Sequence, residues 1–173
     1  MKFLATLLLS VWLLPSCFAQ PQAPNPEADR NDLSNFDSYV RTKSFEEAYG
    51  PWKSLRERNP KYHLSIYTSG EKILEYKIEN TSGTEQKAFI SDLLGLYDQR
   101  IELYAAKTKV GDILSKKAQL MYDYKDELGI NDTQIFDAFN TAYKSDVETF
   151  TNPKALYTFY KVVVRMYDNS EKS

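Results

Sequence analysis

The stretch that decides the fold is SFEEAYGPWKSLRERNP, residues 44–60. Its apolar side chains recur at helical spacing and share one face, which consists of Phe45, Ala48, Tyr49, Trp52 and Leu55. Ser44 and Glu47 match the S-x-x-E pattern of a capping box, which satisfies free backbone N–H groups where a helix begins. Pro60 predicts the end of this helix, because proline cannot continue the hydrogen-bond ladder. The stretch therefore predicts one capped amphipathic helix.

Gly50 and Pro51 interrupt this helix, and a proline there predicts either a kink or a break followed by a new helix. We expect the kink, because the apolar face continues from Ala48 to Trp52 across the interruption. Trp52 lies at the centre of that face. We therefore expect Trp52 to be a buried anchor between helices rather than an exposed ligand contact.

The helical period continues to the end of the chain, and no strand pattern competes with it. Besides the opening stretch, we expect helices over residues 35–43, 62–79, 84–105 and 110–128, and two more that begin at residues 131–132 and 152–153. A second S-x-x-E pattern, Ser82 with Glu85, predicts another capping box. Gly70 lies in mid-helix, where glycine costs about 1 kcal/mol relative to alanine, so we expect a neighbouring helix to approach closely there. The sequence thus predicts an all-α fold of about seven helices in antiparallel pairs.

The two ends of the chain are expected to differ from this helical domain, which we place at residues 35–168. Residues 1–19 have the pattern of an export signal, with a positive start, an apolar run and small residues before Gln20. A competing interpretation is a lipoprotein signal, in which residues 14–17 are a lipobox and Cys17 is acylated. Residues 20–34 are rich in proline, asparagine and charge and are expected to be a disordered linker. Residues 169–173 are expected to be a polar tail.

The composition excludes several functions. The chain has 173 residues, of which 42% are hydrophobic and 27% charged, with a net charge of −2. These values suit one globular domain, and the lack of a basic excess argues against nucleic-acid binding. A single histidine, His63, and a single cysteine, Cys17, predict no metal site, and the dispersed glycines predict no cofactor. His63 precedes an expected helix, so we interpret it as a surface or capping residue.

A glycosidase-type enzyme would need a carboxyl group with a raised pKa or a pair of carboxyl groups. The nominal candidates are Glu46, Glu47, Glu75, Glu79, Asp98 and Glu102. The outer faces of amphipathic helices carry such charges without any catalytic role. We therefore expect no catalytic residue and no enzyme.

Four residues of this region, Tyr39, Ala48, Trp52 and Pro60, lie at the mutual spacing of the tetratricopeptide repeat, a pair of antiparallel helices of about 34 residues. FEEAYGPWKSLRERNPK at 45–61 and LLGLYDQRIELY at 93–104 resemble the N-terminal repeats of exported tetratricopeptide-repeat proteins of Bacteroidetes. This resemblance implies a right-handed α-solenoid of the cell envelope that binds other proteins. The family supplies no catalytic residues, and its members usually continue into further repeats.

The last expected helix is apolar and has no sequence neighbour to cover it, although repeat arrays usually end on a polar capping helix. Three explanations remain open. The chain is the front part of a longer array, the helix folds back as a cap, or the helix mediates association.

Tyrosine is the residue in clear excess, with 13 in the chain. Tyrosine combines rigid contact area with a polar tip, and these properties are common at interfaces. We expect binding at a concave face lined by Tyr39, Tyr67, Tyr97 and Tyr124. The alternative is that these rings fill gaps between helices.

The sequence leaves three functions to compare. We expect a non-catalytic scaffold that binds other envelope proteins in the periplasm or at the outer membrane, with membrane contact only if Cys17 is acylated. A glycan- or nutrient-binding lipoprotein of the outer membrane would need that acylation and an aromatic pocket. A cell-wall enzyme would need catalytic carboxylates.

Overall fold

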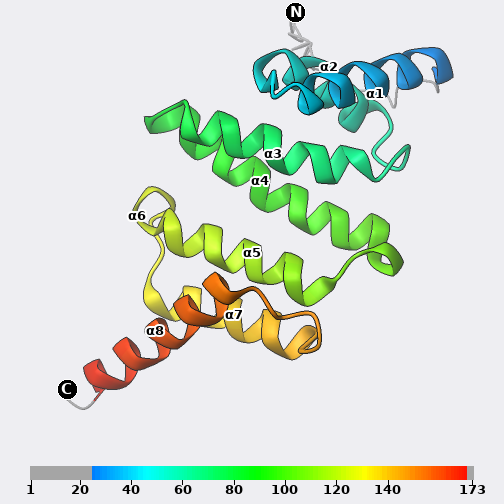
Figure 1. The fold of residues 1–173 in the computed structure, drawn as a ribbon. Helices are drawn as coiled ribbons and strands as arrows, with labels where there is room; N and C mark the ends of the chain where they lie inside the picture. The colour runs from blue at the N-terminus through cyan, green and yellow to red at the C-terminus, as the bar shows by residue number, and fades with distance from the viewer. Residues whose placement is uncertain (1–24, 171–173) are drawn as a thin grey trace, which may run out of the picture.

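The computed structural model describes residues 25–170, and this part of the chain contains helices and loops but no β-strand (Figure 1). Its α-helices are α1 (Pro26–Arg41), α2 (Phe45–Arg58), α3 (Ser65–Glu79), α4 (Gly83–Tyr104), α5 (Val110–Asp123), α6 (Lys125–Leu128), α7 (Asp132–Ser145) and α8 (Pro153–Ser170). A 3-10 turn, Ala105–Lys107, follows α4. The all-α class is confirmed. The predicted export signal, Cys17 and residues 20–24 lie outside the described part.

The first helix begins well before the predicted boundary at residue 35. Asn25 caps it, since the Asn25 side chain accepts a hydrogen bond from the Ala28 backbone N–H at 3.1 Å. Pro26 occupies the first turn, where its missing N–H would have no helical partner in any case. The prediction of a disordered linker is therefore wrong for residues 26–34.

The helix count also differs, with eight α-helices in the described part where about seven were expected. The helix predicted over residues 110–128 is interrupted at Tyr124, and the short α6 follows. Gly129 ends α6 with φ 67°, a left-handed conformation that glycine adopts readily. The last helix also ends later than predicted, because α8 continues through residues 169 and 170, past the predicted end of the helical domain at residue 168.

The two predicted capping boxes are not formed. Ser44 and Ser82 do stand at the N-caps of α2 and α4, but neither side chain makes a capping hydrogen bond. Ser44 Oγ lies 3.2 Å from Thr42 Oγ1 instead, so its hydroxyl contacts the preceding turn. A reciprocal capping box is present at the start of α7, where Asn131 and Gln134 each accept from the other's backbone N–H at 3.0 Å.

The helices pack mainly against their neighbours in sequence, so the chain advances in one direction from α1 to α8 (Figure 1). The closest pairs are α1 with α2, α3 with α4, and α5 with α7. Between these pairs, α2 contacts α3, α4 contacts α5, and α8 lies on α7 and α5. In addition α1 lies against α3, but the described part contains no comparable contact between α3 and α5.

The Trp52 side chain joins the first pair of helices to the second. α2 runs through Pro51 without a break, as expected, and Trp52 is fully buried. Its Nε1 donates a hydrogen bond to the Ile66 carbonyl oxygen at 2.7 Å. The indole also lies on the bare backbone of Gly70, where an added Cβ would come within 2.5 Å of Nε1. The expected burial of Trp52 and the expected close approach at Gly70 are both confirmed.

A buried carboxylate fixes α1 to the end of α2. Arg58 Nε donates to Asp29 Oδ1 at 2.6 Å, and Asn59 Nδ2 donates to Asp29 Oδ2 at 2.9 Å. Arg58 also reaches Asp32 at 2.7 Å. Burial alone would raise the pKa of Asp29, but the hydrogen bonds from Asn59 and Arg58 outweigh it and lower the pKa below its ordinary value.

The Trp52 contact predicts opposite effects for alanine at two mid-helix glycines. Gly70→Ala is expected to destabilise the fold by about 1–3 kcal/mol, because the new methyl group overpacks against Trp52. Gly95→Ala is expected to stabilise it by up to about 1 kcal/mol, because nothing lies within 4 Å of that position in α4. Urea unfolding followed by circular dichroism measures both.

Trp52→Ala is the control that tests whether the Trp52 side chain causes the destabilisation by Gly70→Ala. The truncation alone should cost about 3–5 kcal/mol. In the Trp52→Ala background, Gly70→Ala should no longer destabilise. A stabilising Gly70→Ala in the unaltered protein would contradict the contact.

The Asp29 interaction predicts a pH dependence. Because the folded-state pKa is lowered, the stability that Asp29 contributes is fully present above its unfolded pKa and is lost as pH falls through the folded value. Asp29→Asn should therefore be less stable than the unaltered protein at pH 7, and the difference should narrow below about pH 4. Urea unfolding midpoints of both proteins across this pH range test the prediction. A stability difference that stays constant with pH would contradict it.

Candidate functional site

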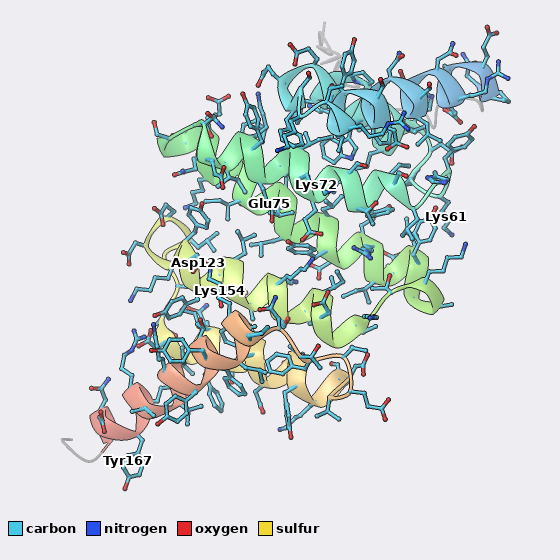
Figure 2. All side chains as sticks on the ribbon, in the orientation of Figure 1. Lys61, Lys72, Glu75, Asp123, Lys154 and Tyr167 are labelled. Atoms are coloured by element: carbon cyan, nitrogen blue, oxygen red, sulfur yellow. The ribbon has the colours of Figure 1, made fainter. Side chains whose placement is uncertain are left out.

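The candidate site is a cavity of about 460 Å³ between α3, α4, α5 and the beginning of α8. It lies where α3 and α5 do not pack on one another, so side chains from both helices face a shared hollow. Figure 2 shows Lys72 and Glu75 on α3, with Asp123 and Lys154 across from them on α5 and α8. The lining is Thr68, Glu71, Lys72, Glu75, Leu93, Tyr97, Lys116, Gln119, Leu120, Asp123, Asn152 and Lys154. We call this space the charged cavity.

One wall of the charged cavity is held together by the Glu71 carboxylate, which accepts hydrogen bonds from two side chains. Lys116 Nζ lies 2.8 Å from Glu71 Oε1, and the Tyr97 hydroxyl donates to the same oxygen at 3.1 Å. Glu71 and Tyr97 come from α3 and α4, whereas Lys116 comes from α5. This cluster therefore connects three helices and neutralises the Glu71 charge.

The opposite wall is organised around Asp123. Gln119 Nε2 donates to Asp123 Oδ1 at 2.8 Å, and Lys154 Nζ lies 2.8 Å from Oδ2. Gln119 is 8% exposed, and its Oε1 is buried without a hydrogen-bond partner in the described structure. A buried acceptor of this kind is costly to leave unsatisfied, so it marks a position where a ligand donor or a water would be stabilised.

The remaining two charges are not neutralised by a direct contact. Among residues 25–170, Lys72 and Glu75 make no ion pair or hydrogen bond with another side chain, and both are exposed at the opening of the charged cavity. Partial burial, the nearby Glu71 and the more distant Glu79 raise the pKa of Glu75, and the charges of Lys116 and Lys72 offset this in part. The charged cavity thus presents one acid and one base that interact through space but have no direct partner among the described residues.

The four predicted tyrosines do not form one exposed surface. Tyr67 is 1% exposed, its hydroxyl donates to the Pro60 carbonyl at 3.1 Å, and burial raises its pKa to about 12. Tyr97 is 3% exposed and lines the charged cavity. Tyr124 is half-buried and lines a smaller adjoining cavity, whereas Tyr39 is exposed on α1. Gap filling therefore describes Tyr67 and Tyr97, and only Tyr39 offers a freely exposed ring.

Sequence reasoning named Glu75 and Glu79 only as weak catalytic candidates and did not find the charged cavity. One signal was available, because Glu71, Glu75 and Glu79 recur every four residues and so fall on one face of α3. Their partners on α5 and α8 could not be read from this spacing. Other candidates are accounted for by ion pairs, since Glu46 pairs with Lys77 at 2.8 Å and Asp98 with Lys117 at 2.6 Å.

His63 acts at a helix start. Its Nδ1 accepts a hydrogen bond from the Ser65 backbone N–H at 3.1 Å, next to the first turn of α3. The described residues contain no cluster of histidine, cysteine and carboxylate side chains suited to a metal ion. Within the same residues, no helix has the length and apolar character needed to cross a membrane.

Comparisons with protein-family models, with curated proteins and with solved structures found no match to this chain.

The raised pKa of Glu75 predicts a stability change with pH. Ionised Glu75 destabilises the fold, and this effect disappears as pH falls through the raised pKa toward the ordinary value of 4.5. Glu75→Gln should therefore be more stable than the unaltered protein at neutral pH, with a difference that shrinks in acid. Urea midpoints measure this, with Glu85→Gln at an exposed position of α4 as the matched control. A Glu75→Gln variant that is less stable at neutral pH would contradict the interpretation.

Proposed function

We propose that this protein is a non-catalytic scaffold of the cell envelope that holds a partner protein through the charged cavity. The cavity itself carries the proposal. Its walls are fixed by the Glu71 and Asp123 clusters, while Lys72 and Glu75 are exposed and make no direct ion pair among the described residues. A fixed site with exposed charges of both signs suits recognition of a complementary surface.

The proposal includes a right-handed α-solenoid of the tetratricopeptide type. The support is the packing of successive pairs, α1 with α2, α3 with α4, and α5 with α7. Ala48 and Trp52, which lie at the spacing of that repeat, are both fully buried. Solenoids bind partners on the surface formed by equivalent helices of successive repeats. Here α3 and α5, the first helices of two successive pairs, supply most of the cavity lining.

The free charges point to the chemistry of the partner. A basic side chain would pair with Glu75, an acidic one with Lys72, and an N–H donor would satisfy Gln119 Oε1. A polar protein segment of mixed charge supplies all three. A glycan is less suited to this cavity, because the Tyr97 ring is buried and offers little face for sugar stacking.

Export and location are part of the same proposal. The signal pattern at residues 1–19 supports a periplasmic or outer-membrane location, and acylation of Cys17 would anchor the chain to the membrane. Mass spectrometry of the mature N-terminus distinguishes a diacylated Cys17 from cleavage before Gln20. An N-terminus that retains the entire signal in cells would contradict export.

The test is crosslinking in intact cells followed by identification of captured proteins. Glu75→Lys and Lys72→Glu should each reduce capture of the partner about tenfold or more, because charge reversal replaces attraction by repulsion. Glu85→Lys and Lys87→Glu make the same changes at exposed positions of α4 and should leave capture unchanged. A bound glycan without any captured protein, or equal effects of all four variants, would contradict the scaffold.

A further inference from the structure

The smaller cavity that adjoins the charged cavity has a volume of about 220 Å³. Its lining is Glu75, Ile78, Glu79, Leu120, Asp123, Tyr124 and Lys154, and four of these residues also line the charged cavity. A helix, which is about 10–12 Å wide, is too large for this space, but the space has room for one long side chain. We call it the acidic pocket, because its lining contains three carboxylates and one lysine.

The lysine of the acidic pocket already has a partner. Lys154 Nζ lies 2.8 Å from Asp123 Oδ2, so this pair is neutral, and Figure 2 shows Glu75 across from it on α3. Glu75 and Glu79 lie one turn apart and are both exposed, and neither side chain makes an ion pair or a hydrogen bond in the part of the chain that the structure describes. The lysines of the charged cavity offset only part of the rise in the pKa of Glu75. The acidic pocket therefore keeps an excess of negative charge.

The hydroxyl of Tyr124 responds to this negative charge. Burial raises the pKa of Tyr124, and the carboxylates of Glu79, Asp123 and Glu127 raise it further, whereas Lys154 lowers it in part. The carboxylates outweigh the lysine because negative charge nearby disfavours a phenolate. The same field would attract a cation that entered the acidic pocket.

An acceptor without a partner lies beside these acids. Gln119 is 8% exposed and lines the charged cavity. Its Nε2 donates to Asp123 Oδ1, which fixes the amide and leaves Gln119 Oε1 without a partner in the described structure. Asp123 lines both cavities, so the acceptor belongs to the region where they meet. This region therefore suits a group that combines positive charge with several N–H donors.

We propose that the partner protein of the scaffold inserts one arginine side chain into the acidic pocket, an inference that rests on the proposed function. The guanidinium pairs with Glu75 and Glu79, and one of its remaining N–H groups faces Gln119 Oε1. The aliphatic stem lies on Ile78 and Leu120. Arginine suits the pocket better than lysine, because its planar fork of five donors serves several acceptors at once and is more weakly hydrated than an ammonium group.

The probe that tests this inference is N-acetyl-arginine amide. N-acetyl-citrulline amide is the matched control, because citrulline has nearly the same shape without the charge. Nuclear magnetic resonance of the full chain follows the side-chain carboxyl carbons during each titration. The arginine probe should shift the Glu75 and Glu79 signals saturably, with a dissociation constant on the order of millimolar, and the citrulline probe should bind at least about tenfold more weakly. Equal binding of the two probes, or no saturable shift with arginine, would overturn the proposal.

A pair of variants tests the position of the site. Glu79→Gln removes one carboxylate from the acidic pocket and should weaken binding of the arginine probe about fivefold or more. Glu85→Gln makes the same change at an exposed position of α4 and should leave binding unchanged. Circular dichroism checks that both variants remain folded. Binding that Glu79→Gln leaves intact would overturn the assignment to the acidic pocket.

Capture of the partner in cells separates this inference from the scaffold function. Glu79→Gln should also reduce crosslinking of the partner, and Glu85→Gln should not. A captured partner together with no binding of the arginine probe would overturn the arginine inference and leave the scaffold standing. Capture of no protein would contradict the scaffold itself, and with it the insertion of an arginine from a partner, even if the probe binds.

Discussion

The position of α3 depends on the contact between the indole of Trp52 and the backbone of Gly70. Glycine is needed there because the indole occupies the space of a side chain, and the bond from Trp52 Nε1 to the Ile66 carbonyl fixes the register of α2 on α3. Glu71 and Lys72 follow Gly70 directly in the chain and line the charged cavity. One turn of α3 therefore contacts the core on one side and forms the cavity wall on the other, so the core contact determines where these charges lie.

The sequence predicted the features that depend on local periodicity. The burial of Trp52, the continuation of α2 through Pro51 and the helix start at Asn152-Pro153 all follow from spacing or from proline chemistry. The start of α1, which was predicted nine residues too late, carries the same start signal of an asparagine cap followed by proline. Asn25-Pro26 repeats the pattern of Asn152-Pro153. A composition rich in proline and charge favours disorder, but it does not exclude a helix whose charged side chains find partners. In the structure, one of those charges is the buried Asp29.

The features that depend on contacts between distant residues were not predictable from one sequence. Glu71 and Lys116 are 45 residues apart, and nothing local indicates that they meet. The frequency of tyrosine at interfaces predicts a surface position for Tyr67 and Tyr97, but it does not distinguish an exposed ring from a buried one. Their hydroxyls find partners inside the fold, at the Pro60 carbonyl and at Glu71, so burial leaves no polar group unsatisfied. The rings thus stabilise the helix packing beside the cavity.

The attachment of α1 to α2 through Asp29 and Arg58 has a geometric consequence for any assembly of this chain. Because Asp29 is held by Arg58 and Asn59, residue 25 leaves the folded body at a fixed point, at the opposite end from α8 (Figure 1). The point where residue 25 joins the body and the exposed apolar residues of α8 therefore lie at opposite ends. A protein tethered through the segment before residue 25 would present α8 at the end away from its tether.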